Sequence, residues 1–246
     1  MDETLLRIRI GHSALFKTID GLRAWLSRSN EPLELVFPAR EDEYRPLLAQ
    51  MDDIAECALG YSPGILSIHA SPLPMEDDDF PSSALAFARL AERVGAGSVT
   101  LHPSKCRRGE DLETLQTTAL ENLRAAQDRT PVTLAVETLG HRRCLLAEDE
   151  IAAFDLPMVL DTTHVGWDAS ARIVDSYMHG IRTIHLSERT SDAHHQPIGQ
   201  ASFDFVAMLS EGGWTGNLIL EYWPWRWRRY EEDVPRLRQA LALAPV

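Results

Sequence analysis

Cysteine is scarce in this sequence of 246 residues, which contains only Cys57, Cys106 and Cys144. Three scattered cysteines are too few for the disulfide framework of a small secreted domain. No hydrophobic run approaches the roughly 20 residues that a helix needs to cross a bilayer. The first ten residues, MDETLLRIRI, also lack the uninterrupted apolar stretch of a secretory signal. The sequence therefore predicts a cytoplasmic protein with no membrane partner.

Basic residues are also few, with 24 lysines and arginines against 37 aspartates and glutamates, for a net charge of −13. Because affinity for nucleic acid depends largely on Lys and Arg that neutralise phosphates, this balance disfavours DNA or RNA as a partner. It does not exclude one, since bound metal ions or a local basic patch can reverse the field at a single site.

Hydrophobic residues make up 44% of the chain and gather in eight short runs separated by helix-like segments. The predicted strands are Leu6–Ile10, Leu33–Phe37, Ile65–Ile68, Ser98–Leu101, Val132–Val136, Met158–Leu160, Thr183–Leu186 and Leu218–Leu220. The clearest predicted helices, Ser82–Val94, Glu110–Gln127 and Glu231–Ala244, carry apolar residues at the i, i+3, i+4 spacing of a buried face.

Eight strand–helix units in a chain of this length predict an α/β protein, a single (β/α)8 TIM barrel over residues 1–246. The strands are continuous apolar runs, as expected for a parallel sheet covered on both faces. A doubly wound open sheet is the structural alternative. It would gather functional residues near one switch point rather than at most strand ends.

Six consecutive predicted strands have, at or next to their carboxyl end, a residue that can bind a metal ion. In chain order these are His69, His102, Glu137, Asp161, His185 and Glu221. The carboxyl ends of barrel strands meet at one mouth, where the active site of such a barrel lies. Carboxylates gathered there would repel one another and take up protons unless a positive charge lay among them.

Imidazoles mixed with carboxylates are ligands that suit Zn²⁺, Mn²⁺ or Fe²⁺, so the pattern predicts a divalent-metal site. A lone strand-end histidine is more often a hydrogen-bonded core residue, and the prediction therefore depends on the joint pattern. His164, in the segment DTTH, and the segment SDAHHQPIG, with Asp192, His194 and His195, extend it. His12, His141 and His179 fall outside it and are expected at the surface or behind the site.

At these residues the chain resembles the xylose isomerase-like TIM-barrel superfamily. This superfamily includes sugar phosphate isomerases and epimerases and the endonuclease IV-like nucleases of AP endonuclease family 2. The resemblance covers nearly the whole chain and is carried by the order His, His, Glu, Asp-x-x-His, His, Asp-x-His, Glu. It implies a shared metal site at Glu137, Asp161, His185 and Glu221.

The two branches of the family imply different chemistry. In the epimerase branch, Glu137 and Glu221 would be the acid/base pair that exchanges the proton next to a carbonyl, and His164 would hold a substrate oxygen. In the nuclease branch, three zinc ions would be held by a larger ligand set. That set is His69, His102, Glu137, Asp161, His164, His185, Asp192, His194 and Glu221.

The chain departs from the nuclease pattern at several points. It has Ser-Glu-Arg after His185 where the nucleases usually show Asn-Asp-x-Lys. One extra residue before Gly199 makes His194 and His195 compete for one role. The segment ASPLP follows His69, where those enzymes place an aromatic residue that enters DNA.

The expected function is a metal-dependent sugar or sugar-phosphate isomerase or epimerase with one to three Zn²⁺ or Mn²⁺ ions per chain. The alternatives are a zinc phosphodiesterase that cleaves DNA at abasic sites and a metal-binding barrel without robust turnover. A homodimer is compatible with each.

The expected substrate contacts are His164, Arg189, His195, Trp223 and Arg226. Arg189 could equally be a solvated loop cation. The tract EYWPWRWRRYEED could stack on bases, stack on a sugar, or simply pack on the barrel mouth.

Overall fold

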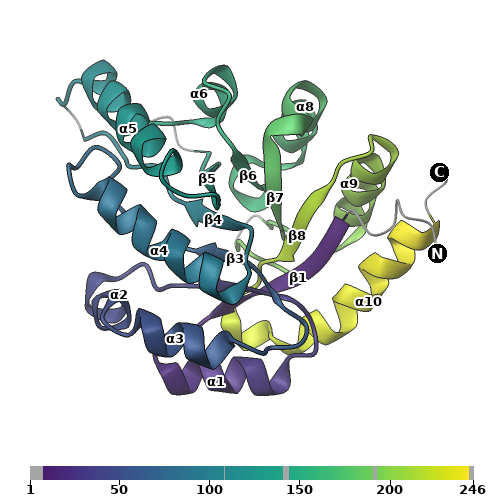
Figure 1. The fold of residues 1–246 in the computed structure, drawn as a ribbon. Coiled ribbons are helices and arrows are strands. Elements are labelled where there is room, and N and C mark those ends of the chain that lie inside the picture. The colour runs from purple at the N-terminus through teal and green to yellow at the C-terminus, as the bar shows by residue number, and fades with distance from the viewer. Residues whose placement is uncertain (1–7, 108, 141–143, 191–192, 244–246) are drawn as a thin grey trace.

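In the computed structural model, which describes residues 8–107, 109–140, 144–190 and 193–243, eight parallel strands close into a barrel with helices around it (Figure 1). The strands follow one another around the barrel in chain order, and the last pairs with the first. They are β1 (Ile8–Leu15), β2 (Leu33–Val36), β3 (Ile65–His69), β4 (Ser98–Leu101), β5 (Thr133–Glu137), β6 (Met158–Asp161), β7 (Ile181–Leu186) and β8 (Gly216–Leu220). The predicted TIM barrel is confirmed.

The helices form the outer layer, and Figure 1 shows α10 lying next to β1, which closes the ring of helices. Their bounds are α1 (Ile19–Arg28), α2 (Glu41–Leu48), α3 (Met51–Ala58), α4 (Phe80–Val94), α5 (Leu112–Gln127), α6 (Glu148–Ala153), α7 (Thr162–Val165), α8 (Trp167–Tyr177), α9 (Gln200–Glu211) and α10 (Arg228–Leu243), with 3-10 turns η2 (Met178–Gly180) and η3 (Pro224–Arg226). In the described ranges, no helix combines the length and apolarity that a membrane crossing requires.

Local capping sets several helix boundaries. The Thr18 hydroxyl accepts a hydrogen bond from the Gly21 backbone N–H, 3.0 Å away, at the start of α1. α4 ends at Gly95, whose positive φ of 75° suits a residue without a side chain. The three predicted helices exist as α4, α5 and α10, with starts shifted by two or three residues.

β1 extends beyond the predicted Leu6–Ile10, because His12 and Ser13 belong to the barrel wall rather than to a loop. His12 is buried, its Nε2 lies 2.8 Å from Ser29 Oγ, and its ring stacks on Tyr230 at 4.2 Å. The Ser13 hydroxyl lies 3.1 Å from that of Tyr230. These partners on α10 and after α1 let two polar side chains continue a strand.

The other two histidines outside the metal pattern lie elsewhere. His179 is in η2, with its Nε2 3.5 Å from Asp155 Oδ1, and both side chains are exposed. His141 lies outside the described residues.

A buried polar cluster lies beneath the barrel mouth, centred on Glu34 of β2. Glu34 Oε1 accepts hydrogen bonds from Ser67 Oγ at 2.7 Å and Thr100 Oγ1 at 3.2 Å, on β3 and β4. Neighbouring strands thus satisfy one oxygen of a carboxylate that is fully buried. This cluster supports the residues above it.

Candidate metal centre

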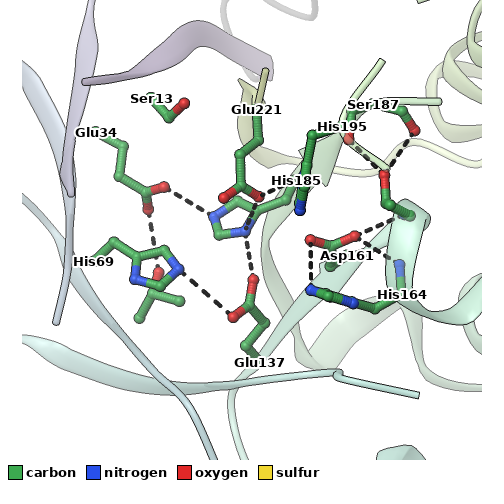
Figure 2. A network of polar contacts seen from close by, with 12 residues as sticks. Ser13, Glu34, His69, Glu137, Asp161, His164, His185, Ser187, His195 and Glu221 are labelled. Atoms are coloured by element: carbon green, nitrogen blue, oxygen red, sulfur yellow. Dashed lines mark hydrogen bonds and ion pairs between the residues drawn. The ribbon is translucent and has the colours of Figure 1, made fainter. Parts of the chain in front are cut away.

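The carboxyl ends of β3 to β8 bring the six strand-end residues to one mouth of the barrel. Figure 2 shows five of them converging, namely His69, Glu137, Asp161, His185 and Glu221. His102 directly follows β4 and lies beside Glu137, with its Nε2 2.6 Å from Glu137 Oε2. The predicted convergence of strand ends is therefore present in the fold.

Asp161 ends β6 because it also caps the single turn of α7. Its Oδ1 accepts hydrogen bonds from the backbone N–H groups of Thr163 at 2.6 Å and His164 at 2.9 Å. Its Oδ2 is buried without a hydrogen-bond partner among the described residues. One oxygen is thus fixed by the backbone while the other is left for a cation.

His185 lies at the centre of the cluster and is fully buried. Its Nδ1 lies 2.6 Å from Glu137 Oε1 and 3.2 Å from Glu221 Oε2 (Figure 2). Its Nε2 lies 2.9 Å from Glu34 Oε2. Three carboxylates therefore surround one imidazole.

Glu137 also reaches a second group of imidazoles. Its Oε2 lies 3.5 Å from His69 Nε2 and 2.6 Å from His102 Nε2, although neither contact is aligned as a hydrogen bond. The rings of His69 and His102 meet edge to face at 4.8 Å. Glu137 therefore lies between His185 on one side and this histidine pair on the other.

The pKa values of two acids in this cluster, Glu137 and Asp161, are shifted in opposite directions. Burial would raise the pKa of Glu137, but the charges of His102, His185 and His69 outweigh it and hold that pKa well below its usual value. Burial raises the pKa of Asp161 well above the usual range, and the charges of Glu221 and Glu137 raise it further.

The pKa values of the His69 and His185 imidazoles are shifted by nearby carboxylates. Burial would lower the pKa of His69, but the neighbouring Glu137 carboxylate overcomes it and raises the pKa to about 9. Glu34, Glu221 and Glu137 likewise overcome the burial of His185 and raise its pKa well above the usual value. Protons on Asp161 and on these imidazoles thus balance the buried charge.

The donor set fits a divalent cation. One ligand atom each from Glu137, Asp161, His185 and Glu221 lie within 4.8 Å of one another, and so do one each from His69, His102 and Glu137. Glu137 Oε2, Asp161 Oδ2 and Glu221 Oε2 are buried without an aligned hydrogen bond among the described residues. Buried carboxylate oxygens normally have partners, and a cation among three of them would supply one.

His164 borders the cluster at the start of the open mouth. Its Nε2 lies 3.8 Å from Asp161 Oδ2. Burial lowers the pKa of His164 to about 4, so its imidazole is neutral at pH 7. A neutral imidazole at this position can exchange a hydrogen bond with a ligand oxygen.

The two adjacent histidines that follow β7 separate in the structure. His195 has a positive φ of 50°, uncommon for a residue other than glycine, and its Nδ1 lies 3.9 Å from Glu221 Oε2. His194 is exposed, and its ring lies 6.3 Å from that of His164. In the described part of the chain, neither belongs to a ligand group. Assignment of His194 as a ligand stays a prediction, and Asp192 lies outside the described residues.

The remaining predicted contacts lie farther out. Arg189 is exposed on the loop after β7, near enough to His194 for its charge to act on that ring. Trp223 contacts the His195 ring edge to face at 5.5 Å, and Arg226 is half-buried in η3. Direct contact of Arg189 and Arg226 with a ligand stays a prediction.

A pocket of about 770 Å³ opens beside the cluster, within the range of small-molecule sites. His102 and His164 lie on its wall next to the cluster. Its charged lining is mixed, with Glu76, Asp77 and Glu110 alongside Lys105 and Arg107. The pocket thus joins the ligand groups to a space that a small polar molecule can fill.

Glu34 is the member of the cluster that sequence reasoning missed. Glu34 lies inside the strand LELV, whereas the sequence prediction considered only residues at the ends of strands. The available signal was a lone acid within an apolar strand of a parallel sheet, where a charged side chain needs a buried partner.

Comparisons with known proteins agree with this geometry. A profile described as xylose isomerase-like TIM barrel matches residues 36–240. No curated protein sequence matches the chain significantly.

Three solved structures illustrate the range of similar barrels. The 3-keto-D-glucoside 4-epimerase YcjR from E. coli has a TM-score of 0.66 at 11% identity, with 96% of this chain and 98% of that chain covered. Endonuclease IV from Thermus thermophilus has a TM-score of 0.61 at 18% identity, with 95% and 99% covered. The IOLI protein with bound zinc has a TM-score of 0.55 at 14% identity, with 95% of each covered.

At these identities the structural likeness establishes the fold alone. The profile match covers most of the chain, and the closed eight-stranded barrel agrees with it. This chain belongs to the xylose isomerase-like TIM barrel family.

Proposed function

We propose that this protein is a divalent-metal-dependent isomerase or epimerase that acts on a sugar or sugar phosphate by proton transfer next to a carbonyl. The observation that carries this proposal is the four-ligand group of Glu137, Asp161, His185 and Glu221, which lies beside an open pocket lined by His102 and His164. A divalent ion bound there, Zn²⁺ or Mn²⁺, would act as a Lewis acid that polarises substrate oxygens.

The residues of the site divide into positioning and proton-transfer roles. Asp161 is held by backbone N–H groups and His185 by Glu34, so both are oriented by the fold. We assign Glu137 and Glu221 the role of the acid/base pair, an assignment supported by the approach of both carboxylates to His185 Nδ1. One takes the proton from the carbon next to the carbonyl to give an enediolate, and the other returns a proton to complete the isomerisation or epimerisation. Neutral His164 hydrogen-bonds a substrate oxygen.

Solvent exchange tests this proposal. The full chain, loaded with Mn²⁺ or Co²⁺, is incubated in D₂O with a panel of aldoses, ketoses and their phosphates, and C–H signals are followed by NMR. We expect exchange next to the carbonyl of at least one compound, and its loss in Glu137→Gln and Glu221→Gln. Glu31→Gln is the control, since Glu31 pairs with Arg238 on α10, away from the mouth. No exchange across the panel, with metal bound, would refute the reaction.

A second candidate, phosphodiester cleavage, is favoured by the second ligand group. His69, His102 and Glu137 share Glu137 with the first group, and an acid shared by two groups suits a two-metal site. Two metals can stabilise the attacking and leaving oxygens of a phosphodiester. A nicking assay on a duplex with an abasic site, at several salt concentrations, tests this candidate. Nicking that disappears in Glu137→Gln would replace the isomerase proposal.

A further inference from the structure

Two tryptophans at the edge of the mouth have no role in the reaction described above. Trp223 is 41% exposed and Trp225 71%, and their rings stack at 5.2 Å with an interplanar angle of 4°. The other large apolar side chains exposed in the described ranges are Leu59 just after α3, Leu112 at the start of α5 and Phe154 just after α6. A stacked pair of exposed indoles is therefore a distinct local surface.

The tract that carries these rings is held firmly. Tyr222, between Glu221 and Trp223, is buried, donates its hydroxyl to Asp233 Oδ2 at 3.1 Å, and accepts from the Ile198 backbone N–H at 3.1 Å. Its ring stacks on Tyr230 at 4.8 Å. The Trp223 indole N–H donates to the His194 carbonyl at 3.1 Å. The Trp223 ring is thus held in one orientation and Trp225 stacks on it, which lowers the entropy cost of binding.

His195 connects the tryptophan pair to the candidate metal centre. Trp223 meets the ring of His195 at 5.5 Å, and His195 Nδ1 lies 3.9 Å from Glu221 Oε2. The His195 ring also contacts that of His164 at 5.7 Å, and His164 lines the pocket. A ligand whose first ring lies at His164 and Glu221 can extend over His195 onto the indoles.

We propose that Trp223 and Trp225 form a stacking platform for a second ring of the substrate, so that the substrate is a glycoside or disaccharide rather than a free monosaccharide. This proposal rests on the proposed function. The C–H face of a sugar ring, or an aromatic aglycone, packs against an indole face by dispersion and quadrupole contacts.

Other occupants fit the surroundings less well. A nucleic-acid strand also stacks bases on indoles, but it needs a positive track for its phosphates. Arg226, Arg228 and Arg229 follow the indoles, but Arg229 is paired with Glu232 and Asp233. The charged lining of the adjoining pocket mixes three acidic residues with two basic ones. A second copy of the chain would need a larger face, because stable interfaces bury about 1,200–2,000 Å² in total. The remaining exposed large apolar residues in the described part lie in or directly after other helices.

Titration calorimetry on the metal-loaded full chain tests the platform. The probes are a panel of disaccharides and 4-nitrophenyl glycosides, each compared with its parent monosaccharide. We expect at least one two-ring compound to bind about 3- to 10-fold more tightly than its parent, the range of one aromatic contact. Trp225→Ala should remove that difference and leave monosaccharide affinity unchanged. Phe154→Ala, a substitution of another exposed aromatic residue, should change neither.

Equal affinity for one- and two-ring compounds, or no binding by any of them, would overturn the platform. It would also be overturned if Trp225→Ala instead weakened binding of an abasic-site duplex or dissociated a dimer in sedimentation. If two-ring binding depends on Trp225 but no sugar exchanges a proton with solvent, the platform stands and the proposed reaction fails. The two failures are therefore distinguishable.

Discussion

Within the described ranges, Glu34 belongs to no ligand group, but it contacts His185, which does, and can determine the orientation of that ring. Its Oε1 is held by Ser67 and Thr100, and its Oε2 lies 2.9 Å from His185 Nε2. A carboxylate on one ring nitrogen favours the tautomer in which the other nitrogen binds a metal. The orientation of His185 thus depends on a residue one layer deeper in the barrel.

We predict that Glu34→Gln weakens binding of Zn²⁺ or Mn²⁺ by roughly 10- to 100-fold, the usual cost of losing such a partner. Competitive titration with a metal-sensitive dye measures the change. Glu31→Gln, at a part-exposed glutamate that pairs with Arg238, is the control and should bind metal like the wild type. Unchanged affinity in Glu34→Gln would show that His185 needs no such support.

A second prediction at this scale concerns His12 and pH. Burial lowers the pKa of His12 from 6.5 to about 4. Well above pH 6.5 the ring is neutral in the folded and unfolded chains and contributes little pH dependence. Below it the unfolded chain binds the proton first, so folding stability falls as the pH drops toward 4, by up to about 3 kcal/mol.

Urea unfolding of the wild type and His12→Phe at pH 7 and pH 4 measures this effect, since phenylalanine keeps the stacking on Tyr230 but does not titrate. The wild type should lose about 3 kcal/mol more than the variant over this interval. Parallel losses in the two proteins would mean that His12 is not the titrating group.

At the scale of elements, the site is built from strand ends and the turns that follow them. Gly140, just after β5, has a positive φ of 61°, and a Cβ there would lie 2.3 Å from the His164 carbonyl oxygen. The turn after β5 therefore packs directly against α7, which carries His164. Contact between these two turns sets the position of His164 at the mouth.

Gly140→Ala should accordingly destabilise the protein more than Gly60→Ala. Gly60 has a φ of 94° with open space around it, so alanine there meets only backbone strain of about 1–2 kcal/mol. At Gly140 the clash with α7 should add about 1–3 kcal/mol to that strain. Denaturant unfolding compares the two variants. Equal losses would indicate that α7 moves aside at no cost.

At the scale of the whole molecule, the barrel and six of its strand-end residues could be predicted from the sequence. Short apolar runs that alternate along the chain with amphipathic helices indicate a (β/α)8 barrel. In such a barrel the carboxyl ends of the strands meet at one mouth. Glu34 and the full length of β1 could not be predicted in this way. Their polar side chains belong in strands only because of partners on distant segments, Ser67 and Thr100 for Glu34 and Tyr230 for Ser13.

The loop after β7 marks another limit of sequence reasoning. In the sequence, His194 and His195 are candidates for the same role. The left-handed backbone at His195 turns its ring toward Glu221, whereas His194 stays exposed. Backbone conformation in a loop is set by tertiary packing, and the spacing of residues does not report it.

The divalent-ion content of the full chain tests the central claim most directly. Wild-type protein and Asp161→Asn are dialysed to equilibrium against Zn²⁺ or Mn²⁺ and analysed for metal. Asparagine keeps an oxygen that can cap α7 but removes the charge, so the fold should persist without the ion. We predict at least one bound ion per wild-type chain and its loss in Asp161→Asn. A wild-type chain that binds no ion, or a variant that binds as many, would contradict the account.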